Sequence, residues 1–321
     1  MLRLRGRQMK HDVHAPTIQH LIFVSYERLE TCLVCGKSDL HNKLVVEDKS
    51  VSKESFAIQQ CRACGFQFTN PRPDAASIER YYESDEYVSH NSGAAGLINQ
   101  AYKVARFFTM RRKVGLINKL IPSKGKLLDY GCGTGHFLAA AKSSGWQVHG
   151  LEPNARARQE AVGRVGASVG TPEELGSLPA GSFDVITLWH VLEHVHTLNE
   201  TLRQLIQLLK PEGVLIIAVP NVESLDAQHY RQDWAAYDVP RHLYHFAPDT
   251  MRQLLKKHKM QVRETLPMAL DAYYVSMLSE KHRAERGQGM LAVLKAGYQS
   301  NRYAAQHDGQ YSSLIYVATR R

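Results

Sequence analysis

Long apolar runs are missing from this sequence of 321 residues. None of its hydrophobic stretches approaches the roughly 18 residues that a membrane-spanning helix needs, so we expect no membrane span. The first residues, Met1–Arg7, are basic, but no apolar stretch of secretory length follows them. We therefore expect residues 1–29 to form a basic, flexible tail and the protein to be cytoplasmic.

Cysteine is scarce, but four of the five cysteines form two close pairs. Cys32 and Cys35 make one C-x-x-C pair, and Cys61 and Cys64 make the other. Two such pairs can supply four thiolates to a tetrahedral zinc ion. Two disulfides or a single redox-active pair are the alternatives; a reducing compartment argues against the first and the repetition of the motif against the second. We predict a zinc ribbon over residues 30–75 with one structural zinc.

Acidic residues are absent between Tyr87 and Leu128, although this segment contains eight lysines and arginines. Apolar residues recur at helical spacing from Leu97 to Phe108, which predicts an amphipathic helix with a basic outer face. This helix belongs to a helical linker or lid over residues 76–122. The basic face, in a chain of net charge +9, is either simply solvated or attracts an anionic substrate or RNA.

The clearest positive signal is a glycine-rich turn between an apolar strand and a helix. Residues Leu127–Phe137 read LLDYGCGTGHF, with three alternate glycines before a helix that starts near His136. Residues without Cβ let the backbone turn sharply against a ligand, and the helix amide groups point at that ligand. A second strand, Trp146–Leu151, ends at Glu152, whose carboxylate can accept both hydroxyls of a ribose. The sequence thus predicts a pocket for an adenosine-containing cofactor.

The glycine spacing separates two classes of cofactor. A dinucleotide fingerprint reads G-x-G-x-x-G, but here the third glycine comes one residue early and His136 stands at its place. The pattern Asp129-x-Gly131-x-Gly133-x-Gly135 resembles motif I of the class I S-adenosylmethionine (SAM)-dependent methyltransferases. The resemblance is to their small-molecule branch, near the ubiquinone-biosynthesis O-methyltransferases. It implies an α/β fold with a doubly wound, seven-stranded Rossmann-like sheet, beside the small N-terminal zinc-ribbon domain.

Later segments agree with this resemblance. Ser182–Val195 looks like the fourth strand of the family and its following turn, and the leucines of helix Leu198–Leu209 lie on one face. Gly213–Asn221 is a continuous apolar strand of the doubly buried kind. Gln261–Leu266 and Ser312–Ala318 match the antiparallel hairpin that closes the family's sheet.

The expected methyltransferase domain spans residues 123–321, with an insertion at about 267–311 that is a candidate lid or far wall of the substrate pocket. The resemblance places cofactor contacts in the glycine loop and just after the second, third and fourth strands. The cofactor residues are Asp129, Tyr130, Gly131, Cys132, Gly133, Thr134, Gly135, Phe137, Glu152, Pro153, Thr171, Trp189 and His190.

Ligands of open α/β sheets bind beyond the carboxyl ends of the strands. The segment after Asn221 reaches this edge and is rich in aromatic rings, so it is either a substrate wall or core packing. Methyl transfer requires alignment of the reactants and removal of a proton, for which histidine is the favoured base near neutral pH. His190, His242 and His194 are the catalytic candidates, and structural hydrogen bonding is the alternative for each.

The turn after the fourth strand departs from the family in one respect. The ubiquinone-type relatives have Glu-Val-x-Glu-His-Val there, with acidic residues implicated in a divalent metal site. This chain keeps Glu193 and His194 but has His190 at the first acidic place. We therefore do not predict metal dependence from this turn.

We predict a SAM-dependent methyltransferase for a small, anionic acceptor such as a sugar, glycan, lipid or quinone-type intermediate, with O-methylation favoured by family frequency. The chain lacks the Asn/Asp-Pro-Pro-Tyr/Phe and Pro-Cys motifs at the fourth strand, which argues against base-amine and cytosine C5 methylation. One alternative is an RNA methyltransferase that grips phosphates with the ribbon and basic helix. A non-enzymatic SAM-binding regulator is another. The sequence predicts no oligomeric state.

Overall fold

The computed structural model describes four stretches of the chain, residues 24–82, 97–166, 168–283 and 289–321. Most of the predicted tail and part of the predicted linker, 83–96, lie outside the described residues. In the helix that begins at Leu97, side chains are described from Phe108 onward, so the apolar stripe proposed there is largely outside them too. Among the described residues, no helix is both long and apolar enough to cross a bilayer.

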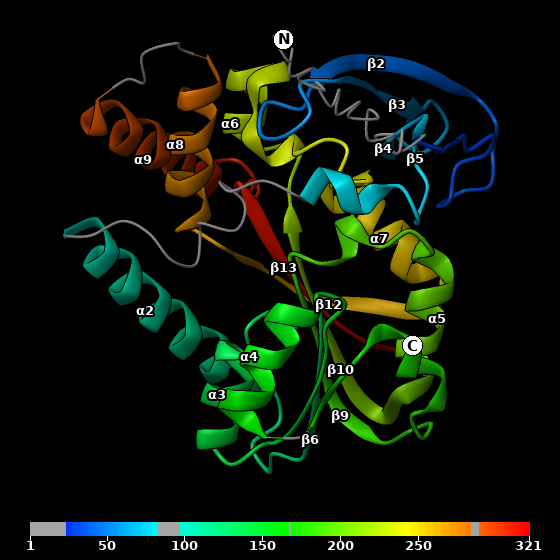
Figure 1. Cartoon of the computed structure of the whole chain (residues 1–321), viewed down its shortest axis with the longest axis vertical. Coiled ribbons are helices and arrows are strands. Elements are labelled where there is room, and N and C mark those ends of the chain that lie inside the picture. The colour runs from blue at the N-terminus through cyan, green and yellow to red at the C-terminus, as the bar shows by residue number, and fades with distance from the viewer. Residues whose placement is uncertain (1–23, 83–96, 167, 284–288) are drawn as a thin grey trace, which may run out of the picture.

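A seven-stranded sheet in the order β12-β13-β10-β9-β6-β7-β8 forms the centre of the molecule (Figure 1). Neighbours from β10 to β8 are parallel, whereas β13 runs antiparallel to both β10 and β12. The predicted fold class and the antiparallel closing hairpin are thus confirmed. The strands are β6 (Lys126–Tyr130), β7 (Gln147–Leu151), β8 (Val169–Gly170), β9 (Phe183–Trp189), β10 (Leu209–Pro220), β12 (Met260–Pro267) and β13 (Ser313–Arg320).

Helices cover both faces of this sheet (Figure 1). On one side, α2 (Leu97–Leu120), α3 (His136–Ser143) and α4 (Ala155–Val165) share one apolar core. On the other, α5 (Leu198–Leu208) and α7 (Pro248–Lys257) share a second. Strands buried on both faces need apolar side chains at every position, which is why the buried part of β10, Val214–Val219, is a continuous apolar run. That strand starts at residue 209 rather than at 213 as expected, because residue 209 already pairs with β9.

The N-terminal module contains a four-stranded sheet in the order β11-β4-β3-β2. Three of its strands, β2 (Leu40–Glu47), β3 (Ser55–Cys61) and β4 (Gln67–Thr69), are consecutive in the chain, whereas β11 (Tyr244–His245) comes from the segment after β10. The short strands β1 (Tyr26–Glu27) and β5 (Arg72–Pro73) pair beside it. The module is therefore joined by backbone hydrogen bonds to the segment that follows β10.

A buried ion cluster fixes the same junction. The guanidinium of Arg241, 1% exposed, donates to Asp48 Oδ1 at 2.9 Å and to Asp238 Oδ1 at 2.7 Å. It also donates to the backbone oxygen of Tyr81 at 2.8 Å. Burial raises the pKa of Asp48, but Arg241 outweighs this effect and holds that pKa below its usual value. The N-terminal module and the segment after β10 thus share one cation.

Replacing Arg241 by methionine is expected to lower the free energy of unfolding by about 3–5 kcal/mol, because it leaves the buried carboxylate of Asp48 without its counter-ion. Urea denaturation at neutral pH measures this. Arg252→Met is the matched control, since Arg252 forms its 2.6 Å pair with Asp249 on the surface, where ion pairs contribute little. Equal stability of the two variants would contradict a structural role for the buried cluster.

The insertion between β12 and β13 contains α8 (Asp271–Arg283) and α9 (Met290–Gln306), which lie beside α6 (Leu225–Tyr230) (Figure 1). The buried carboxylate of Asp226 on α6 accepts hydrogen bonds from Ser300 on α9 at 3.0 Å and from Ser312 at 2.6 Å. These contacts hold the insertion against the segment after β10, so that α8 begins close to the carboxyl ends of the central strands.

Candidate active site

The glycine loop joins β6 to α3 and is tied to the neighbouring strand. The amides of Gly131 and Cys132 both donate to the carbonyl of Leu151, at 2.7 and 3.1 Å. A Cβ at position 131 would lie 2.5 Å from a methyl group of Val191, whereas a Cβ at Gly133 would meet nothing within 4 Å. The loop is therefore packed against protein at its start and faces open space at its middle.

Two buried carboxylates flank this loop. Glu152 is 7% exposed; its oxygens accept from the amide of Gly133 at 2.8 Å and from that of Asn154 at 2.9 Å. Burial raises the pKa of Glu152 despite these hydrogen bonds. Asp129 accepts from the hydroxyl of Thr187 at 2.6 Å, and burial raises its pKa to about 7. Thr187, which the sequence analysis did not single out, thus orients the first residue of the glycine motif.

The residues predicted to contact the cofactor lie at the carboxyl ends of four neighbouring strands, β6 to β9. Thr171 follows β8 and begins a short 3₁₀ turn, and Pro153 follows Glu152. The rings of Phe137 and Trp189 meet edge to face with centroids 5.4 Å apart. The open space at Gly133 beside the acceptor oxygens of Glu152 fits an adenosine-containing cofactor held by backbone contacts and ribose hydrogen bonds.

Helix α2 adds a cation that the sequence analysis counted but did not place in the site. Lys113 Nζ lies 4.3 Å from the centroid of the Trp189 ring. Burial lowers the pKa of Lys113 to about 8, although Asp129 and Asp271 oppose this shift. The sequence signal was its spacing, since Lys113 lies four residues before the buried Ile117 on the inner face of the helix.

His190 directly follows β9, has a left-handed backbone with φ 57°, and lies between two carboxylates. Its Nε2 is 3.0 Å from Asp271 Oδ2, at the start of α8, and its Nδ1 is 3.4 Å from Glu193 Oε1. Burial lowers the pKa of His190, but the two carboxylates outweigh burial and raise it to about 10. The ring is therefore protonated at neutral pH. No sign of this pairing is present in the sequence, because no local pattern links Asp271 to residue 190.

His194 and His242 lie next to each other, with ring centroids 4.6 Å apart. His194 Nδ1 is 3.0 Å from the carbonyl of Arg241 and 3.0 Å from the hydroxyl of Tyr82. His242 Nδ1 is 2.8 Å from the carbonyl of Ala236. Burial lowers the pKa of His194 to about 4, and the proximity of His242 adds to the effect. The structure thus brings all three predicted histidines to one place, on either side of the Glu193 turn.

The backbone at His242 is held from two sides. Thr69 Oγ1 on β4 donates to the carbonyl of His242 at 2.8 Å, and the amide of Leu243 donates to the carbonyl of Glu193 at 2.7 Å. The N-terminal module therefore positions one of the candidate catalytic side chains. Most of the rings after Asn221 are core rather than substrate wall, since each of the following is at most 5% exposed: Tyr230, Trp234, Tyr237, Tyr244 and Phe246.

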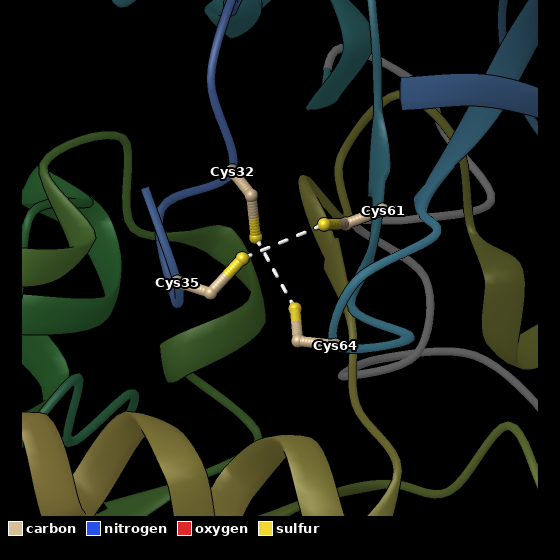
Figure 2. Close-up of side chains that lie close together, drawn as sticks. All are labelled: Cys32, Cys35, Cys61 and Cys64. Carbon is tan, nitrogen blue, oxygen red and sulfur yellow. Dashed lines mark hydrogen bonds between the residues drawn. The ribbon is translucent and has the colours of Figure 1, made fainter. Parts of the chain in front are cut away.

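The four cysteines of the N-terminal module point toward one another (Figure 2). The sulfurs of Cys32 and Cys64 are 3.5 Å apart, as are those of Cys35 and Cys61, and all four lie within 4.8 Å of one another. A tetrahedral zinc with bonds of about 2.3 Å needs sulfurs about 3.8 Å apart, whereas a disulfide needs about 2.05 Å. The cysteines are free, and their arrangement fits the zinc site rather than two disulfides.

Comparison with known proteins agrees with this architecture. Residues 102–265 match the family model described as "Methyltransferase domain". The ubiquinone biosynthesis O-methyltransferase of Caulobacter vibrioides is 34% identical over 102 residues, 30% of this chain and 40% of that protein. That of Rickettsia canadensis is 22% identical over 216 residues, 62% of this chain and 88% of that protein. This chain thus spans less than half the length of the first relative and most of the second.

Among solved structures, magnesium protoporphyrin IX methyltransferase from Synechocystis, crystallised with SAH, superposes with a TM-score of 0.50 at 15% identity. The match covers 77% of this chain and all of that one. At this identity the likeness shows the fold alone. Because the family model matches more than half of the chain, the protein belongs to the methyltransferase-domain family, with the sheet of the class I SAM-dependent methyltransferases.

Proposed function

We propose that this protein transfers a methyl group from SAM to a small, anionic acceptor, with an oxygen as the acceptor atom. The observation that carries this proposal is the glycine loop, where Gly133 faces open space beside the carboxylate of Glu152. The thirteen cofactor residues named from the sequence remain the proposed SAM contacts. The net charge of +9 favours an anionic acceptor, and the curated relatives named as O-methyltransferases support oxygen.

SAM supplies the sulfonium methyl group, and the chain has to align the acceptor and take its proton. His190 is poorly suited to accept that proton, because its ring already carries one between Asp271 and Glu193. We propose instead that His190 helps to position the bound cofactor. His194 and His242, which lie next to each other beside Glu193, are then the proposed groups for removing the proton.

We further propose that Cys32, Cys35, Cys61 and Cys64 hold one structural zinc, in a protein of the cytoplasm. Four thiolates leave no open coordination position, so this zinc would have no catalytic task. Its role would be to fold the module whose β4 strand holds the backbone of His242. Because β4 pairs with β11, this edge of the ribbon is occupied by the segment that carries His242 and is not free to bind RNA. This favours a small-molecule acceptor over an RNA bound by the ribbon.

Incubation of the protein with methyl-labelled SAM and a host-cell extract tests the acceptor class. We expect label in the fraction of small molecules and glycans, and none with the Gly133→Val variant. Label in the RNA fraction would replace this proposal with the RNA methyltransferase, whose binding would fall steeply with salt. SAM binding without any labelled product would favour the non-enzymatic regulator.

A further inference from the structure

A second cavity, of about 510 Å³, lies at the C-terminal ends of α6 and α8, two helices that lie side by side (Figure 1). Its volume is in the range of roughly 300–1,000 Å³ that is typical of sites for small organic ligands. The first residue of α8, Asp271, contacts His190 in the active site, whereas the last, Arg283, lines this cavity. A helix of this length separates its two ends by about 18 Å, so the cavity is distinct from the active site.

The charges on the wall of this cavity are unbalanced. Among the described residues, the ionised side chains that line it are those of Arg231, Arg283 and Asp233. Asp233 is already neutralised, because Lys49 Nζ donates to its Oδ1 at 2.6 Å. Neither arginine forms an ion pair with a carboxylate in the part of the chain that the structure describes. Two positive charges at the cavity therefore lack a counter-ion.

The side chain of Arg283 is held in one orientation. Its Nη2 donates to the carbonyl of His229 at 3.0 Å, its Nη1 lies 3.2 Å from His229 Nε2, and its Cζ is 5.4 Å from the centroid of the Tyr230 ring. Because arginine only donates, Nε2 of His229 accepts this bond. These contacts close the end of α6 but leave further N–H groups of the guanidinium, whose planar fork matches the oxygens of a phosphoryl group.

Arg231 has an unfavourable backbone conformation for a residue with a side chain. Its φ is 50° and its ψ is −124°, a combination that glycine adopts far more easily. The side chain is exposed and makes no hydrogen bond to another described residue, so no contact within this part of the protein offsets the strain. An arginine at such a position is explained by a ligand for its guanidinium rather than by packing.

We propose that this cavity binds the phosphoryl group of a small phosphorylated ligand between Arg231 and Arg283. Two guanidinium charges favour a phosphate ester or a diphosphate over a single carboxylate, and the volume leaves room for an organic part. The ligand is either a distant phosphoryl group of the methyl acceptor or a separate phosphorylated molecule. The inference goes beyond the proposed function and does not depend on it, since binding at this cavity requires no methyl transfer.

Calorimetric titration of the full-length protein with inorganic pyrophosphate tests the site, with excess SAH present to fill the proposed cofactor pocket. We expect one pyrophosphate per chain. Arg231→Gly and Arg283→Gln should each weaken this binding about 10-fold or more, because each removes charge-assisted hydrogen bonds. Arg231→Gly should not lower the melting temperature, since glycine relieves the backbone strain. Arg252→Gln, which removes an exposed arginine of α7, is the matched control and should bind as the wild type does.

Absence of pyrophosphate binding by the wild type would overturn the proposed site, and so would equal affinity of the wild type and Arg231→Gly. Labelling of a cell extract with methyl-labelled SAM then separates the two sources of the phosphoryl group. A raised KM for the extract in Arg231→Gly would place this group on the acceptor, whereas unchanged kinetics would identify a separate ligand. Pyrophosphate binding by a protein that transfers no methyl group would overturn the proposed function and leave this site standing.

Discussion

Replacing Gly133 by valine is expected to weaken SAM binding about 100-fold or more while the fold persists. Gly133 has φ 54°, and a Cβ there would meet no protein atom within 4 Å. The new side chain would therefore occupy the space of the cofactor rather than clash with the core. Isothermal calorimetry with SAM measures the loss, and a thermal melt reports the fold.

The control for this variant is Gly181→Val. Gly181 lies in an exposed turn with φ 62°, and a Cβ at this position would also meet no atom within 4 Å. Valine at either position carries a similar left-handed backbone strain of about 1–2 kcal/mol, but only position 133 faces the proposed pocket. Equal SAM affinity in the two variants would contradict the proposed SAM pocket at Gly133.

Replacing Glu152 by glutamine keeps the shape of the side chain but removes its charge. This variant should bind SAM about 10-fold or more weakly than the wild type.

Replacing Cys61 by serine is expected to abolish zinc binding at the four-cysteine site and to destabilise the N-terminal module. Cys61 is fully buried at the end of β3, and structural zinc sites of this type contribute about 10–16 kcal/mol to folding. The variant should also lose methyl transfer, because β4 can no longer hold the carbonyl of His242 through Thr69. Zinc released by an organomercurial reagent, near one per chain in the wild type, measures the site.

Cys132→Ser is the matched control, since Cys132 lies in the glycine loop outside the four-cysteine cluster. It should retain the releasable zinc. Retention of zinc by Cys61→Ser as well would show that the four thiolates are not a zinc site. Full activity in a zinc-free Cys61→Ser protein would separate the module from the organisation of the active site.

The features that the sequence revealed depend on short stretches of chain. The Asp129–Gly135 pattern, the strands on either side of it and the carboxylate at Glu152 follow from residue spacing and local backbone preferences. The cysteine pairs are equally local, and their separate turns bring the four sulfurs together once β2 and β3 form a hairpin. The domain limits and the roles of the site residues remain predictions.

What the sequence by itself determined about this protein is the glycine loop and the cysteine pairs, because residue spacing specifies them locally, and the methyltransferase sheet, which the resemblance carried by these motifs implied. Only the tertiary structure decided that Asp271 lies against His190, that Arg241 joins two segments, and that His242 lies beside Glu193. These pairs come from segments far apart in the chain. Their contacts arise from the packing of buried charges and strand edges that must find partners, and no local pattern encodes which partner each will meet.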